Sequence, residues 1–127
     1  MTARSDASLV PHLIAASPVH APILAELQAA CFETPWGTEA FTRLLALPGH
    51  AAWLLMRGEQ PLGYALFQLI ADEGELLSIA VVPEQQGLGL GAWLLEKTLK
   101  NCENRNIKRI ILDVRADNVP AQALYKK

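Results

Sequence analysis

The residues best suited to chemistry lie in one glycine-rich segment, Gln86-Gly87-Leu88-Gly89-Leu90-Gly91. Glycine has no side chain to keep a ligand away from the backbone, so successive N–H groups can converge on an anion. An amphipathic helix is predicted directly afterwards, over residues 92–103, and the first N–H groups of a helix carry the positive end of its dipole. The segment therefore predicts a cradle for a phosphate or diphosphate.

Two common nucleotide-binding motifs do not fit these glycines. A P-loop ends in Gly-Lys-Ser/Thr, whereas this segment ends in Gly91-Ala92-Trp93 and lacks the lysine and the magnesium-binding hydroxyl. A Rossmann loop needs the order Gly-x-Gly-x-x-Gly, which the segment does not have, although Asp113 lies at the distance of the acidic residue in such folds. For the segment taken alone, the alternative is a connector that binds nothing.

Four motifs in order along the chain carry a resemblance to a known family. They are Ile79-Ala80-Val81-Val82-Pro83, Gln86-x-x-Gly89-x-Gly91, Asp113-Val114-Arg115-x-x-Asn118 and Ala123-Leu124-Tyr125. Together they resemble the GNAT superfamily of acetyl-CoA-dependent N-acetyltransferases, and in particular its ribosomal-protein N-terminal alanine acetyltransferases. The resemblance spans residues 32–125.

The resemblance implies how acetyl-CoA, as co-substrate, would be held. The backbone of residues 79–81 would bond the pantetheine arm like a neighbouring strand, and the backbone of residues 87–92 would hold the diphosphate. A plain core strand is the alternative for residues 79–81, and Asn118, which would bond the pantetheine, is also a favoured helix N-cap before a proline. The residues implied to bind the cofactor are Ile79, Ala80, Val81, Gln86, Gly87, Leu88, Gly89, Leu90, Gly91, Ala92 and Asn118.

Acetyl transfer to an amine needs a route for the amine proton and a donor for the departing thiolate. By resemblance, Tyr125 would protonate the thiolate, and its alternative role is packing on an amphipathic helix. Asp113 stands where relatives carry a glutamate base, and its shorter side chain would act through a water. Glu75, four residues before Ile79, is the competing base, as in the histone-lysine branch, and its alternative role is a solvated hairpin end.

The acceptor amine bears on how strong a base is needed. A peptide α-amine has a pKa of about 7.7–8.0, whereas a lysine amine has a pKa of about 10.4, so the α-amine needs a weaker base to lose its proton. Trp36 belongs to Thr34-Pro35-Trp36, which resembles the Pro-Trp segment on the acceptor side of relatives; its alternative role is filling a gap under a turn. We therefore expect direct acetyl transfer to a protein N-terminus. Transfer to a small-molecule amine and a non-catalytic acyl-CoA-binding module stay open as alternatives.

Composition indicates one domain and limits the partners. The chain has 127 residues, 51% of them hydrophobic, without an apolar run long enough for a membrane span or a signal peptide, so a cytoplasmic protein is expected. A net charge of −2 without a basic block argues against nucleic acid. Cys31 and Cys102 lie far apart in apolar stripes, which favours buried thiols over a disulfide or a metal site.

The periodicity predicts an α/β fold, with an antiparallel meander, a parallel crossover strand and about four flanking helices. Residues 1–8 are expected to be disordered. Strands are predicted at 10–16, 51–56, 62–70, 75–82 and 107–114, the last one buried, and helices at 18–32, 38–47, 92–103 and after Asn118, with Thr38 as an N-cap.

Two departures from the family pattern affect these expectations. Relatives usually have a basic residue after the motif glutamine, where this chain has Gly87, so phosphate binding would rest on the backbone. The sequence ends at Lys127, before the last two strands of the family, which suggests a shortened chain. An open sheet edge beside residues 107–114 would then invite pairing with a second copy.

Overall fold

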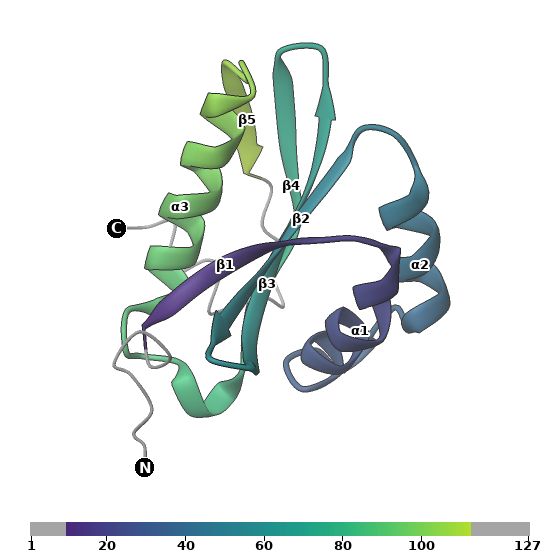
Figure 1. The fold of residues 1–127 in the computed structure, drawn as a ribbon. Helices are drawn as coiled ribbons and strands as arrows, with labels where there is room; N and C mark the ends of the chain where they lie inside the picture. Colours follow the sequence, from purple (N-terminus) through teal and green to yellow (C-terminus); the bar gives the residue numbers. More distant parts are fainter. Residues whose placement is uncertain (1–9, 113–127) are drawn as a thin grey trace.

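The computed structural model describes residues 10–112, and the structural statements below concern this part of the chain. Its elements follow one another as strands, helices and two short 3-10 turns (Figure 1). In chain order they are β1 (Pro11–Ala16), η2 (Pro18–His20), α1 (Ala21–Ala29), α2 (Thr38–Ala46), β2 (His50–Arg57), β3 (Gln60–Ile70), β4 (Glu73–Val81), η3 (Pro83–Gln85), α3 (Leu90–Asn104) and β5 (Arg109–Leu112).

The strands form one sheet in the order β1-β2-β3-β4-β5. The first four pair in antiparallel fashion, and β5 pairs in parallel with β4. A parallel neighbour needs a crossover connection, and α3 provides it. The predicted combination of a meander and a parallel crossover strand is therefore confirmed. Three α-helices fall within residues 10–112, and the fourth helix, expected after Asn118, lies outside the described residues.

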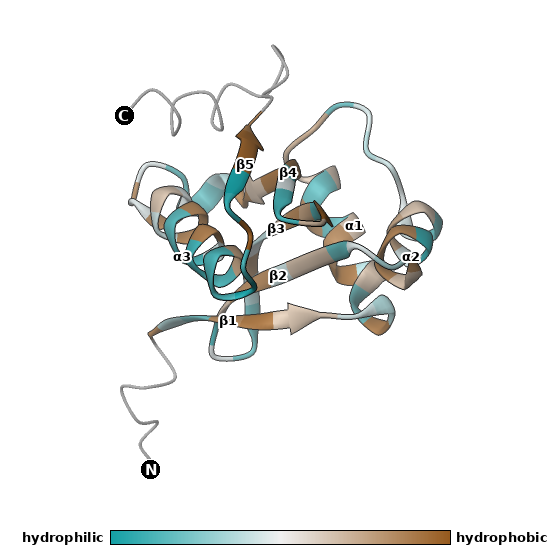
Figure 2. Cartoon of the chain, turned by 90° about the horizontal axis from the view of Figure 1, so that it is seen from above, coloured by the Kyte–Doolittle hydropathy of each residue, from teal (hydrophilic) through white to brown (hydrophobic). Residues whose placement is uncertain are grey.

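The sheet lies between two helical layers, with α3 on one face and α1 and α2 on the other (Figure 2). Successive residues of β2 alternate between these layers: Trp53 and Leu55 pack in the core under α3, whereas Ala52 and Leu54 pack in the core under α1 and α2. Because both faces are covered, the central parts of β2 and β3 are continuously apolar rather than apolar in every second position.

The predicted helix over residues 18–32 is two elements. Pro18–His20 forms a 3-10 turn, and α1 then runs from Ala21 to Ala29. The N–H groups of Cys31 and Phe32 both donate to the carbonyl of Gln28, at 3.0 and 2.9 Å, so the chain tightens into a turn and the helix ends. Among the described residues, no helix is both long and apolar enough to cross a membrane.

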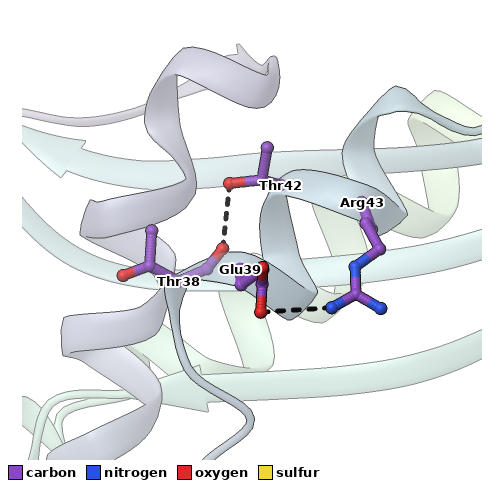
Figure 3. Close-up of polar contacts among 4 residues, drawn as sticks. All are labelled: Thr38, Glu39, Thr42 and Arg43. Carbon is purple, nitrogen blue, oxygen red and sulfur yellow. Dashed lines mark hydrogen bonds and ion pairs between the residues drawn. The ribbon is translucent and has the colours of Figure 1, made fainter.

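Helix α2 begins at Thr38, but its N-cap is Gly37, so the prediction of a Thr38 cap is wrong. Gly37 has φ +91°, a conformation that threonine rarely adopts, and this places Thr38 one position inside the helix. Figure 3 shows the first turn: Thr42 Oγ1 donates to the Thr38 carbonyl at 2.9 Å, and Glu39 pairs with Arg43 at 3.2 Å. Both charged side chains are exposed, so this pair adds a few tenths of a kcal/mol at most.

Strand β5 is more exposed than predicted. Ile111 and Leu112 keep 44% and 40% of their surface accessible, although a buried strand was expected there. In the described part of the chain, β5 pairs only with β4 and forms the edge of the sheet. Among residues 10–112, β5 is thus a partly exposed edge strand, although its apolar composition predicts burial.

Candidate functional site

The glycine-rich segment is a turn with open space in front of it. It follows η3 and leads into α3, and Gly87 and Gly89 have φ +83° and +84°. A Cβ built on either glycine would meet nothing within 4 Å. Glycine is therefore required here by the left-handed backbone rather than by crowding. The backbone of the turn is accessible to a ligand.

Helix α3 begins at Leu90, two residues earlier than predicted. Gly89 is its N-cap in the left-handed conformation, and the Trp93 N–H closes the first turn on the Gly89 carbonyl at 3.0 Å. Gly91 is therefore a helical residue and not part of the connector. The N–H groups of Leu90, Gly91 and Ala92 precede the first intrahelical bond, so they carry the positive end of the helix dipole.

Strand β4 presents main-chain groups on the side away from β3. The Val82 N–H donates to Leu62 at 2.8 Å, and Val81 and Ile79 pair with Gly63 and Ala65. In an antiparallel ladder the hydrogen-bonded and non-bonded pairs alternate. The N–H and C=O groups of Ile79 and Val81 therefore point outward, whereas those of Ala80 face Tyr64.

The pairing of β4 with β5 covers only the first part of β4. It runs from Glu73 opposite Arg109 to Leu76 opposite Leu112. Directly beyond it, β4 has one extra residue, Leu77, because Leu66 pairs with Ser78 while Phe67 pairs with Leu76. Such a bulge bends a strand and increases its twist. Leu112 is the last described residue of β5, and among residues 10–112 no strand pairs with residues 79–81 on the side away from β3.

The glycine turn is tied to this edge by a side chain. Gln86 Nε2 donates to the Val81 carbonyl at 2.8 Å, and the Cys31 thiol donates to the same oxygen at 3.3 Å. Gln86, expected to bind cofactor, thus fixes the turn against β4. Burial raises the pKa of the Cys31 thiol, and the Glu84 carboxylate raises it further.

A buried polar group that the sequence analysis missed lies under α1. Gln28 is 3% exposed, and its Oε1 accepts a hydrogen bond from the Trp36 N–H at 2.7 Å. Tyr64 and Ser78 share a 2.7 Å hydrogen bond. Burial raises the pKa of Tyr64, and its hydrogen bond to Ser78 offsets only part of the increase. A polar residue in the apolar stripe of α1 was the available signal.

Of the predicted catalytic and acceptor residues, only Glu75 and Trp36 lie within the described part of the chain. Glu75 lies in the paired half of β4, opposite Gln68 and Ile111, and is partly exposed. Trp36 is 38% exposed in the connection between α1 and α2. Asp113, Asn118 and Tyr125 lie outside the described residues. Within residues 10–112, no group of three or more His, Cys, Asp or Glu side chains could hold a metal ion.

These features define a class: an α/β domain with an accessible glycine turn at a helix N-terminus, beside outward main-chain groups of a strand. Comparison with known proteins identifies the family. Residues 21–127 match the model of the acetyltransferase (GNAT) family. The chain therefore belongs to the GNAT family of acetyltransferases, and the resemblance read from the sequence is confirmed.

Curated relatives carry the name of one branch. The [ribosomal protein bS18]-alanine N-acetyltransferase of Escherichia coli K12 is 43% identical over 63 residues, covering 50% of this chain and 43% of that protein. A Bacillus subtilis relative that carries the name provisionally is 33% identical over 103 residues, covering 80% of this chain and 68% of that protein. The matched regions thus span from under half to about two thirds of these relatives.

Solved structures share the fold. The E. coli ribosomal-protein-S18-alanine N-acetyltransferase superposes with a TM-score of 0.82 at 27% identity, covering 92% of this chain and 75% of that one. The aminoglycoside N-acetyltransferase AAC(6')-Iy, solved in complex with CoA, gives 0.74 at 14% identity, covering 92% and 85%. At that identity the second likeness concerns the fold alone.

Proposed function

We propose that this protein transfers the acetyl group of acetyl-CoA to the N-terminal α-amine of a protein, by direct transfer between the two bound substrates. The family is one of acetyltransferases, and the curated relatives from E. coli and B. subtilis bear the name [ribosomal protein bS18]-alanine N-acetyltransferase, the second provisionally. The observation that carries the proposal is the accessible glycine turn on the N-terminus of α3, fixed by Gln86 to the Val81 carbonyl of β4.

The main chain fits the proposed cofactor. The N–H groups of residues 87–92 would hold the diphosphate, as they lie in an open turn and a helix N-terminus. The outward N–H and C=O of Ile79 and the outward N–H of Val81 would pair with the pantetheine arm, while Ala80 would contribute no main-chain bond because its groups face Tyr64. Asn118 is proposed to add a side-chain bond. Gly87 replaces the basic residue usual in relatives, so we expect weaker phosphate binding than they have.

The acetyl thioester supplies an activated carbonyl when it is bound. The chain would orient the amine beside it, take the amine proton on Asp113 or Glu75, and return a proton to the thiolate from Tyr125. The two cysteines are unsuited to a covalent route, because burial raises the pKa of both thiols and a thiol attacks as the thiolate. A cytoplasmic location and pairing of two copies stay predictions from the sequence.

Acceptor profiling tests the proposal. Thiol release from acetyl-CoA is measured with a peptide that begins with alanine, the same peptide with a blocked α-amine, a lysine peptide, a polyamine and an aminoglycoside. We expect turnover on the free α-amine and loss of it on the blocked peptide. Turnover only on the small amines would replace the proposed acceptor, and calorimetric binding of acetyl-CoA without turnover on any amine would establish a binding module instead.

A further inference from the structure

We propose that Gln28, Tyr64 and Ser78 are positioning residues that set the acceptor-side Trp36 at a fixed place relative to the bulge in β4. The inference rests on the proposed function, since it assigns these residues a part in acceptor binding. They come from α1, β3 and β4, and the connection that they hold joins α1 to α2.

The first link is the carboxamide of Gln28. This side chain is almost fully buried, and its oxygen accepts the Trp36 N–H at a short 2.7 Å, eight residues along the chain. Removing the Gln28 carboxamide would leave the Trp36 N–H without its hydrogen-bond partner, which costs free energy of folding. The bond therefore holds the backbone of the connection to helix α1 at the residue that carries the exposed indole.

The second link is the phenol of Tyr64. Tyr64 is fully buried and shares a 2.7 Å hydrogen bond with Ser78 Oγ, and burial raises its pKa. The phenol is therefore uncharged and can donate and accept over the physiological pH range. Ser78 follows the bulge residue Leu77 and precedes Ile79, so the link ends directly after the bulge in β4.

A row of aromatic rings runs beside the polar link. The Trp36 ring lies 5.2 Å from Phe41, and Phe41 meets Tyr64 edge-on at 5.8 Å. The row passes from the partly exposed indole to two fully buried rings. Trp36 is thus held at its backbone by Gln28 and at its ring by Phe41, and Phe41 in turn packs on Tyr64. A side chain held in two places can define one wall of an acceptor site.

Gln28→Met tests this inference, because methionine keeps the length of the side chain and removes the hydrogen bond. We expect the KM for the alanine peptide to rise roughly tenfold, which corresponds to about 1.4 kcal/mol, with the Kd for acetyl-CoA unchanged. Gln28→Glu keeps an oxygen acceptor and is expected to restore part of the loss. Tyr64→Phe keeps the ring, removes the hydroxyl, and should raise the same KM; it carries the test if Gln28→Met does not fold.

Thr98→Val is the matched control for a buried polar loss. Thr98 is fully buried in α3, on the other face of the sheet, and its hydroxyl bonds carbonyls of its own helix at 2.8 and 3.2 Å. We expect a lower Tm, with the peptide KM and the acetyl-CoA Kd unchanged. Amide exchange gives a readout without turnover: the Trp36 N–H should exchange at least tenfold faster in Gln28→Met and at the wild-type rate in Thr98→Val.

The outcomes separate the two proposals. If the wild type is active and Gln28→Met has the same peptide KM, the inference is overturned and the proposed function stands. An equal rise of the peptide KM and the acetyl-CoA Kd overturns it as well, because that pattern reports general loosening. A wild type that turns over no amine overturns the proposed function, and unchanged Trp36 exchange would remove the link itself.

Discussion

At the scale of single residues, the glycines of the turn are defined by backbone conformation. Gly89 has φ +84° and ψ −2°, in the left-handed region, and it caps α3. The glycine-rich turn before α3 is predicted from the sequence, because the spacing of glycines before an amphipathic stretch is visible there. The start of the helix was placed two residues late, because glycine has poor helix propensity and Gly91 therefore read as part of the connector.

Replacing Gly89 by alanine separates strain from ligand binding. We expect Gly89→Ala to lower stability by about 1 kcal/mol, because a Cβ is strained at this φ even with open space around it. We also expect weaker binding of CoA, measured by calorimetry. Gly37→Ala is the control, since Gly37 has φ +91° and the same free space in a different part of the chain. Equal CoA affinity in both variants would remove Gly89 from the proposed cradle.

The assignment of the base is a question of single carboxylates. If Asp113 takes the amine proton, Asp113→Asn should lower kcat by about 10²–10⁴-fold while Glu75→Gln stays near wild type, and the reverse pattern would assign Glu75. Tyr125→Phe should lower kcat by a similar factor with the Kd for acetyl-CoA unchanged. Steady-state kinetics with the alanine peptide gives the comparison, and an unaffected Tyr125→Phe would remove the acid role.

At the scale of elements, β4 is the strand that joins both halves of the proposed site. Its existence, approximate ends and antiparallel partner were predicted from apolar runs separated by turn residues. The bulge at Leu77 was not, because a continuous apolar run has the same letters whether or not one residue is unpaired. The outward direction of Ile79 and Val81 depends on that register, so the sequence alone left a core strand as an equal alternative.

Gly63 tests how closely β3 and β4 must approach. A Cβ at Gly63 would overlap the Ala80 carbonyl oxygen and lie 3.2 Å from the Val81 Cα, so backbone would have to shift. We expect Gly63→Ala to cost about 1–3 kcal/mol in denaturant unfolding and to weaken CoA binding. At Gly74 the same change meets the side-chain ends of Ile110 and Leu69 at 2.9 Å, which can turn away. Gly74→Ala should therefore cost less, and equal costs would contradict this account.

At the scale of the whole molecule, two cores on opposite faces hold the sheet. Hydrophobic periodicity predicts the strands and helices that build them but not the division into two cores. Strand β5 was misjudged because apolar composition reports the tendency to be covered and not how many strands lie beside it. The link between Gln28 and Trp36 could not be read from the sequence either. The two residues meet only because α1 packs against the connection that follows it, and the sequence does not show this packing.

The pH dependence of stability is a property of the folded molecule as a whole. Burial raises the pKa of Cys102 from an ordinary 9.0 to about 11. Between these values the unfolded chain loses this proton while the folded chain keeps it, so the free energy of unfolding falls as the pH rises. We expect Cys102→Ala to be less stable at pH 8 but to lose less of its stability by pH 11. Urea unfolding at the two pH values measures this, and parallel losses would contradict it.

The Val81 carbonyl has a consequence for the shape of any ligand along β4. A carbonyl oxygen offers two lone pairs, and the side chains of Gln86 and Cys31 already donate to this one. A pantetheine arm carries two amides, and neither of their N–H groups would find a vacant acceptor at Val81. The arm would have to turn an amide oxygen toward the Val81 N–H and offer its hydrogen to Ile79, which fixes the direction in which the cofactor threads past the strand.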